Sequence, residues 1–112
     1  MNEFYQNDII SIKDYNKEQL EKIFVSTDKI MQLNPSDRRE ICKGKILGYL
    51  FYEPSTRTRL SFDAAIASIG GNSLGISDVL YSSAQKGESL ADTVRIMSIY
   101  SDVLVLRHTL DG

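Results

Sequence analysis

A short segment of the chain combines side chains that can bind an anion. Ser55, Thr56 and Thr58 carry three hydroxyl groups, and Arg57 and Arg59 carry two guanidinium groups. A hydroxyl donates one hydrogen bond, whereas the planar guanidinium fork can donate two at once to phosphate or carboxylate oxygens. The segment therefore predicts a site for a phosphate-like anion.

A capped surface helix is the alternative interpretation of the same segment. In that case Arg59 and Asp63 would form an ion pair one helical turn apart, worth ~0.2–0.5 kcal/mol. We favour this structural role for Arg59 alone. For Ser55 to Thr58 as a group we favour anion binding, because a helix needs one capping residue and not three hydroxyls around an arginine.

The flanking residues predict how the segment is held. Residues 46–52 are apolar and aromatic, as in a buried strand of a parallel sheet. Pro54 favours an extended Glu53, and Ser55 is a suitable N-cap, so we expect a helix from there to about Ile69. Its expected apolar face consists of Leu60, Ala64, Ala65, Ile66 and Ile69. A helix N-terminus presents unpaired N–H groups to an anion.

Two later apolar runs extend the pattern. Residues 73–76 predict a weak second strand, and residues 102–106 predict a third strand that is apolar enough to be central. Helices are expected between the strands, the second one beginning at Glu88 or Ser89. This alternation predicts a three-layer α/β/α fold with a parallel sheet and right-handed crossovers. Ligands bind beyond the carboxyl ends of such strands, so we expect Arg107 at the same edge as the hydroxyl-rich segment.

An amphipathic helix is predicted ahead of the sheet. Asn16 and Gln19 have the spacing of a capping box, in which each side chain bonds the other residue's backbone N–H. The helix is expected to end at Asn34 and Pro35. We expect its apolar face to pack onto the sheet or onto a later part of the chain.

Composition limits the classes of function. With 112 residues the chain is at most one small domain, and its 42% apolar and 25% charged residues are ordinary for a globular protein. The net charge is −2, so we expect no cationic surface that could bind nucleic acid or anionic lipid. The single cysteine, Cys42, has no second cysteine or histidine near it, so we expect no metal site. The acidic, polar N-terminus predicts a cytoplasmic protein.

Residues 51–62 read Phe-x-Glu-Pro-Ser-Thr-Arg-Thr-Arg-x-Ser-Phe. This stretch resembles the carbamoyl-phosphate signature of the aspartate and ornithine carbamoyltransferase family, and Glu53 and Pro54 together with Leu60 favour the aspartate-using branch. Residues 86–93 and 102–108 match two further family stretches in the same order, so the resemblance covers essentially the whole chain. It implies that residues 1–112 are an incomplete N-terminal carbamoyl-phosphate-binding domain and that an aspartate-binding domain is absent.

The resemblance implies roles for the residues of the segment. Ser55, Thr56, Arg57 and Thr58 would bind the phosphate of carbamoyl phosphate, and Arg107 would bind its phosphate and carbonyl side. Arg57, Thr58 and Arg107 would also be catalytic, because they stabilise charge that develops during the reaction. No cofactor is implied.

Four further residues receive roles from the resemblance. Lys86, with Ser82 beside it, would reach into the site of an adjacent subunit and contact phosphate and aspartate. Glu53 would orient Arg107, although a plain loop carboxylate is an equal alternative. His108 would be a positioning or structural residue.

The function implied is transfer of the carbamoyl group from carbamoyl phosphate to the amine of L-aspartate. The products would be N-carbamoyl-L-aspartate and phosphate, in pyrimidine (UMP) biosynthesis. The resemblance implies a homotrimer and leaves open whether regulatory chains attach to it. Two alternatives stay open: ornithine or another amino acid as the acceptor, and a non-catalytic remnant that only binds anions. We expect residues 1–112 alone to be inactive.

Overall fold

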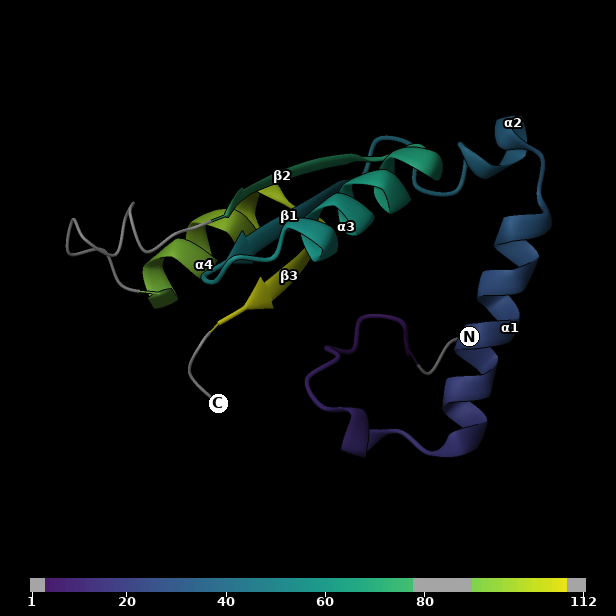
Figure 1. The fold of residues 1–112 in the computed structure, drawn as a ribbon, viewed down its shortest axis with the longest axis horizontal. Helices are drawn as coiled ribbons and strands as arrows, with labels where there is room; N and C mark the ends of the chain where they lie inside the picture. Colours follow the sequence, from purple (N-terminus) through teal and green to yellow (C-terminus); the bar gives the residue numbers. More distant parts are fainter. Residues whose placement is uncertain (1–3, 78–89, 109–112) are drawn as a thin grey trace. The chain divides into compact units, whose positions relative to one another are not determined.

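The computed structural model describes residues 4–77 and 90–108 (Figure 1). By its internal contacts the chain divides into two compact units, Met1–Asn34 and Pro35–Gly112. Among the described residues, no helix combines the length and the apolar character that a membrane span requires.

The first unit contains a short 3-10 helix, η2 (Ile12–Asp14), and the helix α1 (Lys17–Gln32). The capping box is confirmed: the N–H of Gln19 donates to Asn16 Oδ1 at 2.8 Å, and the N–H of Asn16 donates to Gln19 Oε1 at 2.9 Å. None of the side chains of α1 is buried. Packing of its apolar face against another part of the chain therefore stays a prediction.

The second unit begins with a single helical turn, α2 (Pro35–Arg38). The sequence predicted only a polar connection here. Proline suits the first residue of a helix, because its backbone dihedral φ is already helical and the N–H that it lacks would have no intrahelical partner there. The preceding helix ends at Gln32, slightly before the predicted Asn34 and Pro35, and Pro35 starts the new turn.

Three parallel strands form the sheet: β1 (Ile46–Phe51), β2 (Asn72–Ser77) and β3 (Val103–Arg107). The parallel arrangement is confirmed, and the strand order is β2-β1-β3. Among the described residues the central strand is therefore β1, and β3, which the sequence suggested for the centre, pairs on one side only. The register places both Ser77 and Arg107 opposite Phe51.

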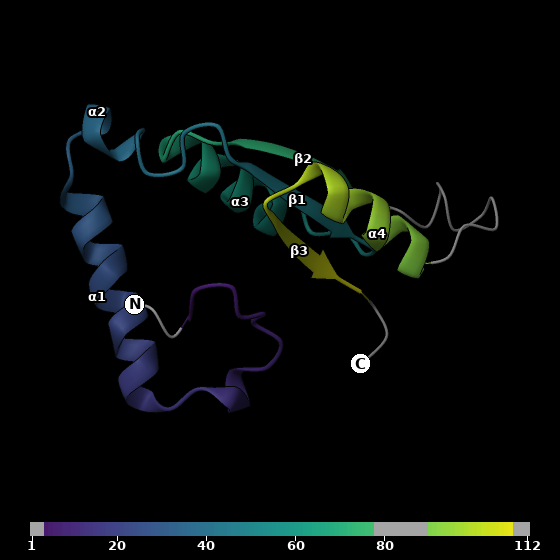
Figure 2. The ribbon, with the colours of Figure 1, turned by 180° about the vertical axis from the view of Figure 1, so that it is seen from behind.

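Helices α3 (Thr56–Ser68) and α4 (Leu90–Tyr100) cover opposite faces of the sheet (Figures 1 and 2). Alternate side chains of a strand point to opposite faces. Leu47, Tyr49 and Phe51 accordingly pack with Ile66 of α3, whereas Leu50 and the following Tyr52 pack with Met97 of α4. The predicted α/β/α layers are thus built around one buried strand. The start predicted for α4, Glu88 or Ser89, lies outside the described residues.

The buried face of α3 differs from the predicted one. Ile66 is buried and Ile69 is partly buried, as expected, but Leu60 is 52% exposed. The predicted members Ala64 and Ala65 are also exposed. Phe62 takes their place in the core. Residues 58, 62, 66 and 69 follow the helical spacing of one stripe, so the helix buries the side on which Thr58 also lies.

A glycine ends α3 as the sequence predicted. Gly70 has a φ of +97°, a left-handed conformation that side chains disfavour. A Cβ atom at this position would lie 1.7 Å from the carbonyl oxygen of Arg39. Glycine is therefore required at position 70 for two reasons: its backbone is left-handed, and the segment before β1 leaves no space for a Cβ atom.

Candidate functional site

The candidate site lies at the carboxyl edge of the sheet. Because Phe51, Ser77 and Arg107 are register partners at the ends of β1, β2 and β3, the three strands end side by side. The hydroxyl-rich segment follows β1 directly and enters α3 at Thr56. The predicted meeting of this segment with Arg107 at one sheet edge is confirmed.

Arg107 contacts both the loop after β1 and the start of α3. Its Nε donates a hydrogen bond to Glu53 Oε1 and forms an ion pair with that carboxylate. Its Nη1 donates a longer hydrogen bond to Thr58 Oγ1 at 3.4 Å. The side chains of Arg107 and Glu53 are 47% and 31% exposed, so a ligand can reach the pair. The carboxylate of Glu53 therefore lies against the Arg107 guanidinium, which is the contact that the predicted orienting role of Glu53 requires.

Ser55 occupies the N-cap position of α3 but does not cap the helix with its side chain. Its hydroxyl donates instead to the carbonyl oxygen of Glu53 at 3.1 Å. The first-turn N–H groups of a helix lack intrahelical partners. Since the Ser55 side chain does not accept from them, these donors are left for another acceptor. This corrects the prediction of a side-chain cap and strengthens the case for an anion at this helix end.

A small hollow of about 110 Å³ opens beside the start of α3. Its lining residues are Pro54, Ser55, Thr56, Arg59 and Ser77. Since ~10–15 Å³ of such space is enough for one water, the hollow has room for water or for a small anion. The sequence analysis missed Ser77. Its position at the end of β2, on the ligand-binding edge of a parallel sheet, is the signal that could have found it.

The two arginines of the segment differ in their surroundings. The predicted pair of Arg59 with Asp63 is confirmed, with Nη1 and Oδ2 separated by 3.5 Å. Asp63 Oδ1 is buried without a hydrogen-bond partner. Arg57, by contrast, is exposed at the second residue of α3 and is not among the residues that line the hollow. Lys86 and Ser82 lie outside the described residues.

His108 lies directly after β3, and its ring packs on that of Tyr52. The two ring centroids are 4.8 Å apart and the planes make an angle of 47°. The half-buried His108 is therefore tied to the core by a ring contact, as a positioning or structural residue would be.

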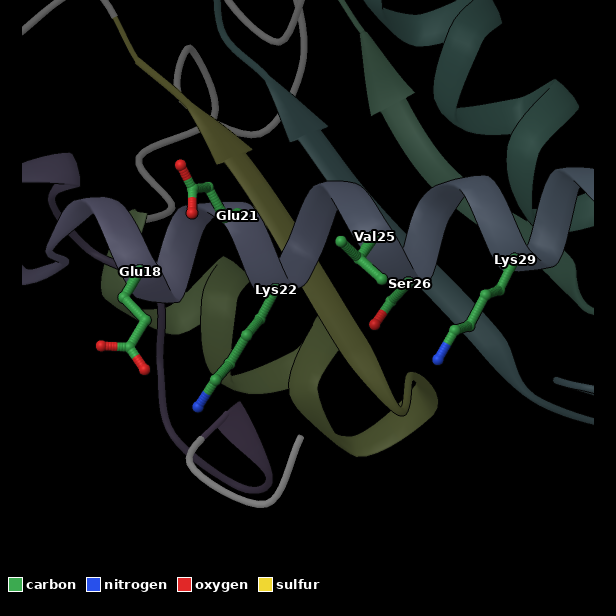
Figure 3. Close-up of a pocket in the computed structure, with 6 residues that line it drawn as sticks. All are labelled: Glu18, Glu21, Lys22, Val25, Ser26 and Lys29. Atoms are coloured by element: carbon green, nitrogen blue, oxygen red, sulfur yellow. The ribbon is translucent and has the colours of Figure 1, made fainter.

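A larger hollow of about 350 Å³ lies on the first unit, along one side of α1 (Figure 3). Its lining residues are Glu18, Glu21, Lys22, Val25, Ser26 and Lys29. All of them come from one helix, whose interior N–H groups are already bonded to carbonyls of the same helix. Two of the lining residues, Glu18 and Glu21, are also acidic and would repel an anion. We interpret it as a space between solvated side chains.

Comparison with known proteins identifies the family. The family model described as "Aspartate/ornithine carbamoyltransferase, carbamoyl-P binding domain" matches residues 7–112. The chain belongs to the aspartate/ornithine carbamoyltransferase family. The resemblance seen in residues 51–62 is thereby confirmed.

Relatives and solved structures within the family agree with this assignment. The chain is 81% identical, over its whole length, to the aspartate carbamoyltransferase catalytic subunit of Nitrosopumilus maritimus, and covers 36% of that protein. It superposes on the catalytic subunit of M. jannaschii aspartate transcarbamoylase with a TM-score of 0.85 at 46% identity, covering 93% of this chain and 35% of that one. The Trypanosoma cruzi aspartate transcarbamoylase in complex with carbamoyl phosphate and aspartate gives a TM-score of 0.79 at 34% identity, covering 91% and 34%. The chain thus spans about a third of the length of these carbamoyltransferases.

Proposed function

We propose that the protein carrying this chain is the catalytic chain of an aspartate carbamoyltransferase. It transfers the carbamoyl group of carbamoyl phosphate to the amine of L-aspartate, giving N-carbamoyl-L-aspartate and phosphate. One observation carries the proposal: the hydroxyl-rich start of α3 meets Arg107 at the carboxyl edge of the sheet, where Glu53 and Thr58 hold the guanidinium. The 81% identity to a protein named aspartate carbamoyltransferase catalytic subunit supports aspartate as the acceptor.

The phosphate of the substrate would lie at the start of α3. The first-turn N–H groups, the hydroxyls of Ser55 and Thr56, and the guanidinium of Arg57 supply donors to its oxygens. The partial positive charge at the helix N-terminus favours the phosphate dianion further. These donors also stabilise the inorganic phosphate that leaves.

The carbonyl group of the substrate would lie between Thr58 and Arg107. The amine nitrogen of aspartate attacks the carbonyl carbon and forms the new C–N bond, and the carbonyl oxygen becomes negatively charged. Thr58 and Arg107 donate hydrogen bonds to this oxygen. When the C–O bond to the phosphate breaks, the carbonyl is restored, and phosphate leaves with the bonding electron pair and takes up the proton that the nitrogen loses. Fixed donors of this kind are commonly the largest contribution to catalysis.

Other parts of the reaction would depend on residues outside 4–77 and 90–108. In our proposal residues 1–112 form the N-terminal carbamoyl-phosphate-binding domain, and later residues of the native polypeptide bind aspartate. Lys86 and Ser82 would serve the site of an adjacent subunit, which requires an oligomer, and we propose a homotrimer in the cytoplasm. The pathway we propose is pyrimidine (UMP) biosynthesis. Regulatory chains are a further possible partner of that trimer.

An acceptor assay tests the proposal. The native polypeptide that contains this sequence is purified, its intact mass and oligomeric state are measured, and it is assayed with carbamoyl phosphate and either L-aspartate or L-ornithine. We expect carbamoyl-aspartate and phosphate in equal amounts from a trimer. Turnover with ornithine alone would move the protein to the other branch of the family. Binding of phosphate without turnover of either amine would indicate a non-catalytic protein.

A further inference from the structure

The two residues that follow β1 make three different contacts with Arg107, the last residue of β3, and with the next residue, His108. The N–H of Tyr52 donates to the carbonyl oxygen of Arg107 at 2.8 Å. The carboxylate of Glu53 pairs with the side chain of Arg107. The ring of Tyr52 packs on the ring of His108, with centroids 4.8 Å apart. Residues 52–53 and residues 107–108 are therefore joined by a backbone hydrogen bond, an ion pair and a contact between two rings.

The residues that make these contacts differ in how deeply they are buried. Tyr52 is only 4% exposed and packs with Leu50 and Met97 in the core between the sheet and α4. The ion pair of Glu53 and Arg107 is partly exposed, and ion pairs in contact with water hold a side chain weakly. Tyr52 is therefore the rigid member of the group.

Arg107 needs such an anchor because of its place in the strand. It is the last residue of β3, and ends of strands open more readily than their middles. The backbone hydrogen bond to Tyr52 extends the β1–β3 pairing past Phe51, the last residue of β1. The ring contact with His108 fixes the residue after Arg107 as well. Both contacts limit the positions that the Cα atom of Arg107 can take.

We propose that Tyr52, acting with His108, is a positioning residue of the carbamoyl-phosphate site. It fixes the end of β3 and thereby the guanidinium of Arg107, without itself contacting the substrate. The inference rests on the proposed function, which assigns Arg107 to carbamoyl phosphate. It goes beyond that function by assigning a role to two rings outside the substrate contacts, which together fix the end of β3.

Four variants of the native polypeptide test the inference: Tyr52→Leu, Tyr52→Phe, His108→Ala and the double variant Tyr52→Leu/His108→Ala. Measured for each are kcat, KM for carbamoyl phosphate, the inhibition constant of inorganic phosphate and the thermal midpoint. A misplacement of about 1 Å can cost ~10²-fold in rate, so a loosened Arg107 is expected to raise KM for carbamoyl phosphate about tenfold. Tyr52→Phe keeps the ring and is expected to restore the original KM.

The ring pair of Phe4 and Tyr15 provides a matched control. Their centroids are 5.5 Å apart, and both residues lie in the first unit of the chain. Tyr15→Leu is therefore expected to change the thermal midpoint without changing KM for carbamoyl phosphate. In the double variant the effect on KM is expected to equal that of either single variant, because both act through one contact.

A lower thermal midpoint with unchanged KM in Tyr52→Leu and His108→Ala would overturn the inference. If Tyr52→Leu does not fold, the KM of His108→Ala alone decides the question. His108 is only half-buried, so this variant is expected to fold. Arg107→Ala separates this failure from failure of the proposed function. If Arg107→Ala is inactive while the ring variants keep their KM, only the positioning role is wrong. If Arg107→Ala keeps normal activity, the carbamoyl-phosphate role proposed for Arg107 is wrong, and if the unaltered polypeptide shows no turnover, the proposed function itself is wrong.

Discussion

The Nε atom of Arg107 donates a hydrogen bond to the carboxylate of Glu53, a residue 54 positions earlier in the chain. Glu53 follows the central strand, and Arg107 ends the neighbouring strand. The pair thus joins the ends of two neighbouring strands at the carboxyl edge of the sheet. Because the same guanidinium also contacts Thr58, this ion pair links the loop, the helix start and the strand end.

Removing the charge of Glu53 is expected to loosen Arg107. Glu53→Gln keeps an oxygen that can accept a hydrogen bond but loses the charge assistance, which makes such a bond roughly twice as strong. We expect kcat/KM for carbamoyl phosphate to fall about tenfold, equivalent to ~1.4 kcal/mol. Steady-state kinetics of the native polypeptide measure this. Glu40→Gln, which breaks an exposed pair with Lys43, is the control and should have no effect.

Shortening Arg57 is expected to remove most of the activity. Loss of one donor to charge that develops in a transition state costs ~10²–10³ in kcat. Arg57→Ala should lose at least this much, and Arg57→Lys should recover only part, because lysine lacks the planar fork. Arg95→Ala, on the exposed side of α4 and paired there with Asp92, is the matched control. Near-normal rates for Arg57→Ala would contradict the assignment.

Gly70→Ala is expected to destabilise the fold. The left-handed conformation of Gly70 costs a residue with a side chain ~1–3 kcal/mol, and the new Cβ atom would collide with the carbonyl oxygen of Arg39. Gly44 has a φ of +78° but no atom within 4 Å of such a Cβ, so Gly44→Ala isolates the backbone contribution. Urea unfolding of the native polypeptide measures both. If both variants lost the same free energy of unfolding, the segment at Arg39 would have moved away from the new Cβ atom, and the predicted cost of the collision would be wrong.

The two predicted helix caps are expected to respond differently to alanine. Asn16 accepts from the backbone of Gln19, so Asn16→Ala should lower the free energy of unfolding by ~1 kcal/mol. Ser55 accepts no such bond, so Ser55→Ala should cost less in stability. In our proposal Ser55 donates to phosphate, and its alanine variant should bind inorganic phosphate more weakly. Urea unfolding and phosphate inhibition measure the two effects. A loss of stability with Ser55→Ala as large as with Asn16→Ala would contradict this distinction.

Local patterns along the chain were enough to predict most of the elements. The apolar run of β1, the capping box at Asn16 and the glycine after α3 depend on neighbouring residues only, and each lies where it was predicted. Strand and helix alternation then predicted the parallel sheet and the edge at which Arg107 lies. The hydroxyls and arginines of the candidate site could be recognised because they are close together in the sequence.

Contacts between distant residues had to come from the folded chain. The ring contact between Tyr52 and His108 and the lining role of Ser77 depend on which strands are neighbours, and periodicity within one strand carries no information about its partners. The Ser55 hydroxyl turns to the carbonyl of Glu53 because the path of the loop, and not residue type, decides which acceptor lies near. Residue type therefore determines which groups can donate, and packing between distant segments determines where those donors point.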